Sequence, residues 1–180
     1  LTVTAVEGGA GDDAVTTGSG NDLVIAGEGA DAVNAGDGAN IVIGDLGAVR
    51  LVWSAGQLMQ LVAETILPTL GGADAITAGS GADVVIGGVG ADRITAGDGT
   101  NTVLGDNGLV LWALAAAEPN WTGLADGILS AAEYAALMAA IAAAPAVGAI
   151  PVTVRLALAT RATAGGNDTI TTGSGEDVVI

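Results

Sequence analysis

Residues 8–43 read GGAGDDAVT, TGSGNDLVI, AGEGADAVN and AGDGANIVI, four consecutive nonapeptides of one design. Each begins with a glycine-rich turn, places Asp or Asn at its sixth position and ends in a short apolar strand. The same unit returns at residues 71–104 and 165–180, which makes ten copies in all. Repetition of this regularity predicts a fold made by stacking one small unit along an axis.

The copies alternate between two kinds, so the structural period is eighteen residues rather than nine. The eighth position is β-branched in all ten copies, which predicts an inward-facing residue in a thin core. Its neighbours are small or polar in odd copies, such as Ala14 and Thr16, but almost all apolar in even copies, such as Leu23 and Ile25. We therefore expect two parallel sheets, one facing water and one with an apolar outer face that needs a cover.

Two stretches interrupt the repeats, and both contain apolar runs typical of strands. Val49–Trp53 and Leu58–Ala63 flank a short turn and predict a hairpin. The longer interruption begins and ends with strands and carries a predicted helix at about residues 131–144. Ser130 and Glu133 form a capping box at the start of that helix.

The predicted organisation therefore has six segments. They are a returning strand of a preceding connector (1–7), a first repeat block (8–47), a hairpin connector (48–68), a second block (69–108), an enlarged connector with the helix (109–162) and the start of a third block (163–180). The connector hairpins and the helix stripe Tyr134 to Ile141 are the nearest candidates to cover the apolar sheet. Another subunit or a further copy of the repeat is the alternative.

The negative charge of the chain is concentrated in the turns. The formal net charge is -16, and fifteen of the twenty acidic residues lie in glycine-rich turns. This balance argues against nucleic acid as a partner. The longest uncharged stretch, residues 134–154, is interrupted by proline and glycine, so no membrane-spanning segment is expected.

The stacked turns bring like charges together. Residues eighteen apart should lie roughly 4.8 Å apart, which places Asp13 over Asp31 and Asp74 over Asp92. Each such pair would repel by roughly 0.9 kcal/mol even in water. Glycines can aim backbone carbonyls into the same gap, and hard oxygen ligands of this kind suit several Ca²⁺ ions. Because the chain has no His and no Cys, a site for a softer metal is not expected.

The unit resembles the nonapeptide GGxGxDx(apolar)x of the RTX (repeats in toxin) family, which GGAGDDAVT matches at every fixed position. The resemblance implies an all-β fold of right-handed parallel β-roll (β-solenoid) blocks, joined here by two-stranded hairpin connectors, one of which carries the short α-helix. It also implies that sixth-position side chains and turn carbonyls bind Ca²⁺ between stacked turns.

The implied side-chain ligands are Asp13, Asp22, Asp31, Asp74, Asp83, Asp92, Asp168 and Asp177, with Asn40, Asn101, Asp45 and Asp106 at the end of each full block. The implied carbonyl ligands are those of Gly9, Gly11, Gly18, Gly20, Gly27, Gly29, Gly36, Gly38, Gly79, Gly81, Gly88, Gly90, Gly97 and Gly99. For Asn40 and Asn101, a tolerated turn residue and a ligand are equally good interpretations.

A second calcium-like fragment lies in the enlarged connector. Residues 126–133 look like the second half of an EF-hand loop, but Thr122 and Leu124 stand where that family has carboxylates or Asn. A turn followed by a helix cap is the preferred interpretation, with metal binding as the alternative.

Together these features predict a calcium-binding structural module of a secreted or cell-surface bacterial protein: a stalk, surface layer, adhesin or fibre that folds and stiffens on binding calcium. The resemblance supplies the bacterial origin and the extracellular location. A folding and export module attached to a secreted enzyme or toxin outside this chain is the alternative. No enzymatic activity is expected, because the chain has no His, Cys or Lys. The expected partners are calcium and, through self-association, further copies of the repeat.

Overall fold

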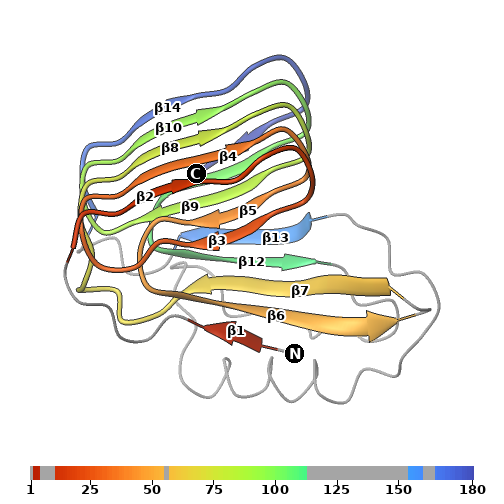
Figure 1. Ribbon diagram of the computed structural model, residues 1–180, viewed down its shortest axis with the longest axis horizontal. Helices are drawn as coiled ribbons and strands as arrows, with labels where there is room; N and C mark the ends of the chain where they lie inside the picture. Colours follow the sequence, from red (N-terminus) through yellow and green to blue (C-terminus); the bar gives the residue numbers. More distant parts are fainter. Residues whose placement is uncertain (1, 5–10, 55–56, 113–153, 160–164) are drawn as a thin grey trace.

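The computed structural model describes residues 2–4, 11–54, 57–112, 154–159 and 165–180. All the regular structure in these residues is β-strand (Figure 1). The predicted helix at 131–144 and the EF-hand-like fragment at 126–133 lie outside them. Within the same ranges, no helix has the length and apolar character needed to cross a membrane.

Two parallel five-stranded sheets are built from the repeats. The odd sheet has the order β14-β10-β8-β4-β2, with β2 Ala14–Thr16, β4 Ala32–Gly36, β8 Ala75–Ala78, β10 Arg93–Ala96 and β14 Thr169–Thr171. The even sheet has the order β15-β11-β9-β5-β3, with β3 Leu23–Ile25, β5 Ile41–Ile43, β9 Val84–Gly88, β11 Thr102–Asp106 and β15 Val178–Val179. Val15 pairs with Val33, and Val24 pairs with Val42. The predicted parallel sheets with an eighteen-residue register are confirmed.

The register continues across both interruptions. Ala32 pairs with Ala75, and Arg93 pairs with Thr169. In the same layers, hydrogen bonds from a backbone N–H to an Asp side-chain oxygen join residues 43 and 76 apart. These spacings exceed the eighteen-residue repeat by the lengths of the segments 46–70 and 107–164, respectively. Each interruption is therefore an insertion within one nonapeptide, and all three repeat segments share the same two sheets.

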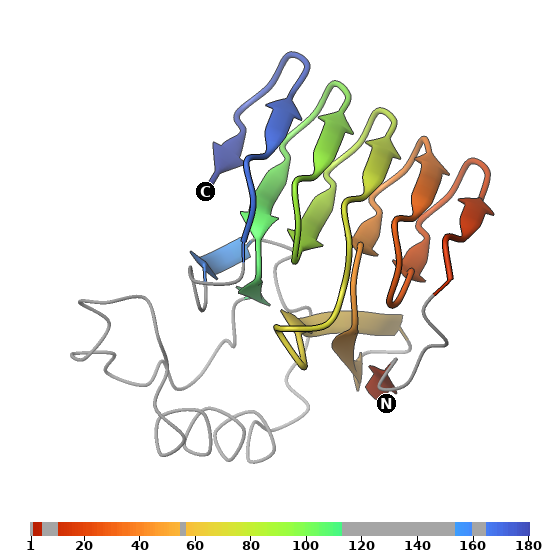
Figure 2. The same cartoon turned by 90° about the vertical axis from the view of Figure 1, so that its left-hand side faces the viewer.

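The inserted strands build a third sheet, which we call the connector sheet. It is antiparallel with the order β1-β6-β7-β12-β13, where β1 is Thr2–Thr4, β6 Gly47–Ser54, β7 Gln57–Thr65, β12 Gly108–Trp112 and β13 Val154–Ala159. The predicted hairpin corresponds to β6 and β7, and the ends of the longer insertion pair as β12 and β13. Figure 2 shows this sheet beyond the even sheet, on the side away from the odd sheet.

Three layers enclose two apolar cores. Between the odd and even sheets lie the eighth-position residues, together with three first-position alanines, Ala35, Ala78 and Ala96. The eighth-position residues that are buried or packed there are Val15, Val24, Val33, Val42, Ile76, Val85, Ile94, Val103 and Ile170. The tenth, Val179, is 51% exposed in the outermost strand β15.

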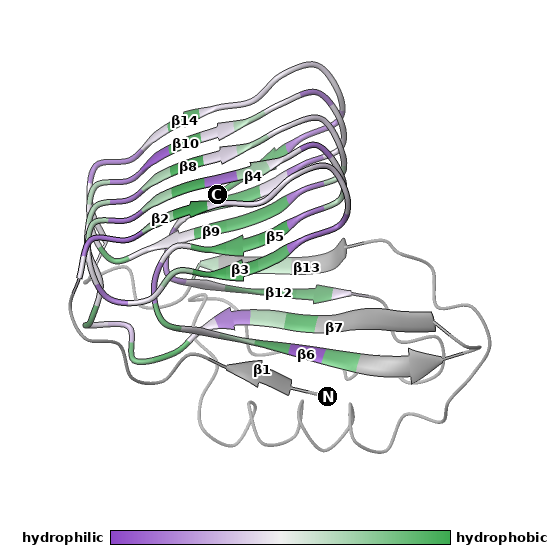
Figure 3. Cartoon of the chain, in the orientation of Figure 1, coloured by the Kyte–Doolittle hydropathy of each residue, from purple (hydrophilic) through white to green (hydrophobic). Residues whose placement is uncertain are grey.

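The second core lies between the even sheet and the connector sheet. Ile43, Ile86 and Leu104 of the even sheet are fully buried in it. The connector sheet contributes Val49, Ala63, Val110 and Trp112. Figure 3 shows the apolar colouring of the even sheet continued in β12. The apolar outer face is thus covered by the inserted strands of the same chain, the first of the predicted candidates.

Candidate metal-binding turns

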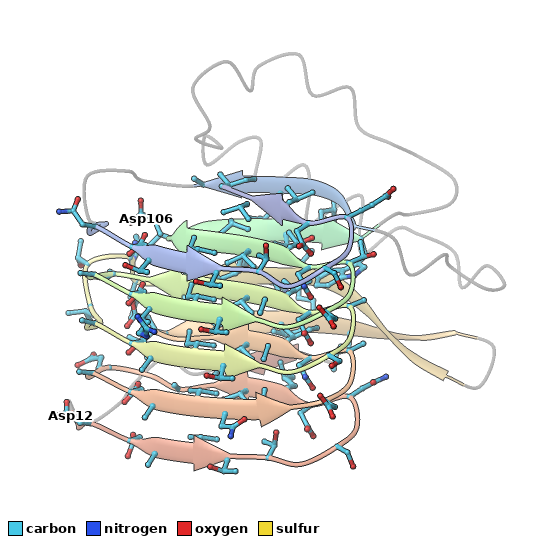
Figure 4. All side chains as sticks on the ribbon, turned by 90° about the horizontal axis from the view of Figure 1, so that it is seen from above. Asp12 and Asp106 are labelled. Atoms are coloured by element: carbon cyan, nitrogen blue, oxygen red, sulfur yellow. The ribbon has the colours of Figure 1, made fainter. Side chains whose placement is uncertain are left out.

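The turns that join the two parallel sheets lie at two opposite edges of the stack. At the acid edge, the turns lead into the odd sheet and carry in stacking order Asp13, Asp31, Asp74, Asp92 and Asp168. At the mixed edge, the turns lead into the even sheet and carry Asp22, Asn40, Asp83, Asn101 and Asp177. Asp12 and Asp106, labelled in Figure 4, mark the acid edge.

Each edge has its own ladder of hydrogen bonds, and the two ladders follow the same pattern. On the acid edge, the Asp31 Oδ1 accepts the Asp13 N–H at 2.8 Å, and the Asp74 Oδ1 accepts the Asp31 N–H at 2.8 Å. Asp92 and Asp168 continue the series. The mixed edge repeats it through the Oδ1 atoms of Asn40, Asp83, Asn101 and Asp177. One oxygen of each sixth-position side chain, from the second layer on, is thereby used to hold the adjacent turn.

The second oxygen of these carboxylates has no such partner. Among the described residues, buried Oδ2 atoms without a hydrogen bond belong to Asp22, Asp31, Asp74, Asp83 and Asp92. An acceptor buried without a donor costs about 1–3 kcal/mol, and more when it is charged. A cation is the simplest group that removes this cost from several turns at once.

Backbone carbonyl oxygens converge on the same places. A Cβ built on Gly87 would collide with both the Asp92 Oδ2 and the carbonyl oxygen of Gly105. A Cβ on Gly44 would meet the Asp74 Oδ2 and the carbonyl oxygen of Gly87. A carboxylate oxygen and a carbonyl oxygen from the next turn therefore lie beside the same glycine on the acid edge.

From the second layer of each edge on, the fourth-position glycines are equally close to their neighbours. A Cβ on Gly38 would collide with the Gly20 carbonyl, and one on Gly81 with the Gly38 carbonyl. Gly38 and Gly81 also have φ values of 129° and 151°, which side chains with a Cβ rarely adopt. The other predicted carbonyl ligands belong to the same two kinds of turn, except that Gly9 lies outside the described residues.

Asp45 and Asp106 occupy a different position from the other predicted ligands. They are second-position residues, and each stands where its insertion leaves the acid edge. The Asp45 Oδ1 accepts the Gly72 N–H at 3.0 Å, and its Oδ2 accepts the Val89 N–H. The Asp106 Oδ1 accepts the Gly166 N–H at 3.0 Å. These side chains tie the start of each insertion to the point where the nonapeptide resumes.

Burial and mutual repulsion change the acidity of the acid edge. Burial raises the pKa of Asp74 to about 8, with further increases from Asp45, Asp92 and Asp31, against a hydrogen bond from the Asp31 backbone that lowers it. Burial likewise raises the pKa values of Asp45 and Asp92 to about 7. The edge therefore binds protons unusually strongly when no metal neutralises it.

Sequence reasoning missed a second set of polar side chains in the turns. The Asp12 and Asn21 Oδ1 atoms accept the N–H groups of Ala30 and Ala39 in the following layer. The Asp37 Oδ1 accepts the Ser80 N–H, and the Asp98 Oδ1 accepts both the N–H and the hydroxyl of Ser174. The third position of the mixed edge reads Ser19, Asp37, Ser80, Asp98 and Ser174, an alternation that could have revealed part of this set.

The donor set fits a hard cation. In the described ranges, no three carboxylates gather closely enough to hold a metal by themselves. A bound ion would therefore need glycine carbonyls as well as the sixth-position carboxylates, and both kinds of oxygen suit calcium.

Comparison with known proteins agrees with this chemistry. A family model described as RTX calcium-binding nonapeptide repeat matches the chain in four copies, at residues 7–42, 16–51, 69–108 and 163–180. Together the copies cover more than half of the 180 residues. Comparisons with curated proteins and with solved structures found no match. The chain belongs to the RTX calcium-binding nonapeptide repeat family.

Proposed function

We propose that this chain is a calcium-stabilised structural module of a secreted or cell-surface bacterial protein, with its two parallel sheets as the walls of a right-handed β-solenoid. The buried, unpartnered Oδ2 atoms of Asp31, Asp74 and Asp92 are the observation that carries the proposal. When these stacked carboxylates are ionised, they form a column of negative charge that the described protein groups do not neutralise. Calcium ions bound between the turns would neutralise it.

Binding and folding should be coupled at this site. Each carboxylate approaches its neighbours only when the turns are stacked, so the unfolded chain offers no comparable set of ligands. Calcium then stabilises the folded state by mass action, and the stabilisation grows with its concentration. A chain of this kind would stay loosely structured in calcium-poor solution and become rigid where calcium is abundant, as it is outside cells.

A mechanical role, as in a stalk, surface layer, adhesin or fibre, follows from the shape of the stack. Each strand contacts mainly the strands one layer above and below, so added repeats extend the structure along one axis. No catalytic role is proposed, because the sequence has no His, Cys or Lys, three residue types that often act as base or nucleophile.

Circular dichroism of the metal-depleted chain, followed during titration with calcium and separately with magnesium, tests the proposal. We expect β-sheet signal and thermal stability to rise with calcium. We expect a smaller response to magnesium, because Mg²⁺ demands a regular octahedron and loses water reluctantly. Small-angle scattering should show the chain contracting on calcium addition. Identical spectra and dimensions in chelator and in millimolar calcium would overturn the proposal.

A further inference from the structure

Two turns of the mixed edge, residues 35–40 and 96–101, carry Asn where the others carry Asp. Both side chains are buried, Asn40 being 1% exposed and Asn101 0%. The Oδ1 of each accepts a backbone N–H, from Asp22 at 3.0 Å and from Asp83 at 3.1 Å. Because an N–H group can only donate, these bonds fix the orientation of both amides, and Nδ2 is the second atom of each side chain.

The Nδ2 atoms are used within their own turns. The Asn40 Nδ2 donates to the carbonyl oxygens of Gly36 at 3.0 Å and Gly38 at 3.3 Å. The Asn101 Nδ2 donates to the Gly97 carbonyl at 2.8 Å. The Asn40 side chain also lowers the pKa of the Asp83 carboxyl in the next layer, against the larger increase from burial. The amide nitrogen of Asn40 thus lies between two carbonyl oxygens, which are ligands that a hard cation such as calcium also prefers.

Asp22 and Asp83 provide the comparison within the same edge. Their second side-chain atom is an acceptor instead of a donor, and it is buried without a hydrogen bond in the described part of the chain. The nonapeptides are equivalent by register, so this Oδ2 occupies the place that Nδ2 takes in the Asn turns. In the Asn turns, Nδ2 donates to carbonyl oxygens of the same turn. In the Asp turns, Oδ2 needs a cation or a donor that the described part of the chain does not provide.

We propose that the side-chain amides of Asn40 and Asn101 take the place of a calcium ion, so that these two turns close without metal. The inference rests on the proposed function, since it divides the repeats into turns that need calcium and turns that do not. The acid edge has Asp at all five sixth positions and therefore has no such turn. In calcium-poor solution the mixed edge would hold alternate layers together while the acid edge loosens.

Hydrogen exchange followed by NMR on the metal-depleted chain tests the proposal. In the wild-type chain we expect the Asp83 amide, which donates to Asn101, to exchange more slowly than the Asp74 amide, which donates to Asp92. Asn101→Asp should remove the protection of the Asp83 amide, and Asn40→Asp that of the Asp22 amide. Calcium should restore both.

Asn21→Asp is the matched control. Asn21 lies on the same edge, is exposed, and accepts a backbone N–H through Oδ1, so its replacement adds the same charge without removing a buried donor. We expect it to leave both amides protected. If a variant unfolds when depleted of metal, equilibrium dialysis in calcium provides the second readout, in which Asn40→Asp and Asn101→Asp should each bind one additional ion.

The outcomes separate this inference from the proposed function. A wild-type chain that binds no calcium overturns the proposed function. If the wild-type chain binds calcium but Asn40→Asp and Asn101→Asp match Asn21→Asp in both exchange and ion count, the inference on the amides is wrong. Equal protection of the Asp83 and Asp74 amides in the metal-depleted wild-type chain would also contradict it.

Discussion

The acid edge and the mixed edge share a backbone design but differ in how they handle charge. Both use Oδ1 of the sixth-position side chain to hold the adjacent turn, and both pack glycine against a carbonyl of the neighbouring layer. The second terminal atom of the sixth-position side chain differs. It is an oxygen throughout the acid edge, and it alternates between oxygen and nitrogen along the mixed edge. The backbone stacking is therefore the same whether the sixth position is Asp or Asn. Under the proposal above, the need for metal differs from turn to turn.

The two insertions also distinguish the acid edge from the mixed edge. Both leave the stack at the acid edge, through Asp45 and Asp106, and both return there. The connector sheet that covers the even sheet is thus attached where negative charge is densest. Neutralisation of this edge by calcium would steady the attachment as well as the turns.

Glycine substitutions should have the largest effect, and the two edges should respond alike. A Cβ on Gly90 of the acid edge would collide with the Gly72 carbonyl, and one on Gly99 of the mixed edge with the Gly81 carbonyl. We expect Gly90→Ala and Gly99→Ala each to lower the free energy of unfolding by about 3 kcal/mol, from overpacking and from positive φ together. Denaturant titration in calcium measures this.

Gly20→Ala is the control for that experiment. Gly20 has a similar φ of 140°, but nothing lies within 4 Å of its Cβ position. It should therefore show only the conformational cost, about 1–2 kcal/mol. Equal losses for Gly20→Ala and Gly99→Ala would mean that the tight stacking contributes nothing.

The pH dependence should distinguish the edges next. The pKa of Asp74 is about 8 and those of Asp45 and Asp92 about 7 when folded, against ordinary values near 4 when unfolded. The folded state thus binds more protons, so this stability is complete below the unfolded pKa and is lost as pH rises through 7 to 8. The metal-depleted chain should melt at higher temperature at about pH 5 than at about pH 9.

Calcium should remove or reverse this trend, because it competes with protons for the same oxygens. Isothermal titration in buffers of different ionisation enthalpy should then detect protons released on calcium binding near neutral pH. A melting temperature that rises with pH in the metal-depleted chain would contradict the charge distribution described for the acid edge.

Much of this contrast could be predicted from the sequence, because it depends on periodicity. The eighteen-residue register, the inward eighth position and the apolar face of the even sheet all follow from the alternation of two nonapeptides. The sequence alone did not show that the first insertion interrupts a nonapeptide, although Gly44-Asp45 and residues 71–77 together make one. The core role of Ala35, Ala78 and Ala96 was not predicted, because only the eighth position was assigned to the core.

The function of the Asn side chains could not be predicted in the same way. Asn40 and Asn101 are compatible with either a ligand or a turn residue until the direction of each amide is known. That direction depends on a backbone N–H eighteen residues away and on carbonyls within the same turn. Long-range hydrogen bonds of this kind have no counterpart in local sequence pattern.

Replacing a single sixth-position acid should change the stability by less than the glycine substitutions do. The change should be a gain without metal and a loss in calcium. In the metal-depleted chain at about pH 9, Asp74→Asn should raise the free energy of unfolding by about 1–3 kcal/mol, since a buried unpartnered oxygen becomes a donor. Asp83→Asn should raise it less. Burial is the largest cause of the raised pKa at both residues, but three neighbouring carboxylates add to it at Asp74 and only Asp37 adds to it at Asp83. In calcium both variants should be less stable than the wild type. A loss of stability in both conditions would contradict the comparison.

The smallest expected effect concerns Asp98, an exposed acid of the mixed edge. Its pKa is lowered, whereas the pKa values of the buried acids on the acid edge are raised. Hydrogen bonds from the Ser174 backbone and hydroxyl hold the pKa of Asp98 below its ordinary value. A lowered folded pKa contributes stability above the unfolded pKa, and that stability is lost as pH falls through the folded one. Asp98→Asn should therefore weaken the chain slightly at neutral pH and have no effect in strong acid.

Ser174→Ala provides the check on this last effect, because it removes the hydroxyl donor and keeps the N–H bond to Asp98. The two variants and their combination form a double-mutant cycle, measured by denaturant titration in calcium. A coupling energy that disappears on acidification would show that the exposed acids of the mixed edge act through hydrogen bonds to the next layer. A coupling that grows on acidification would place Asp98 with the buried acids, and the division between the two edges would fail.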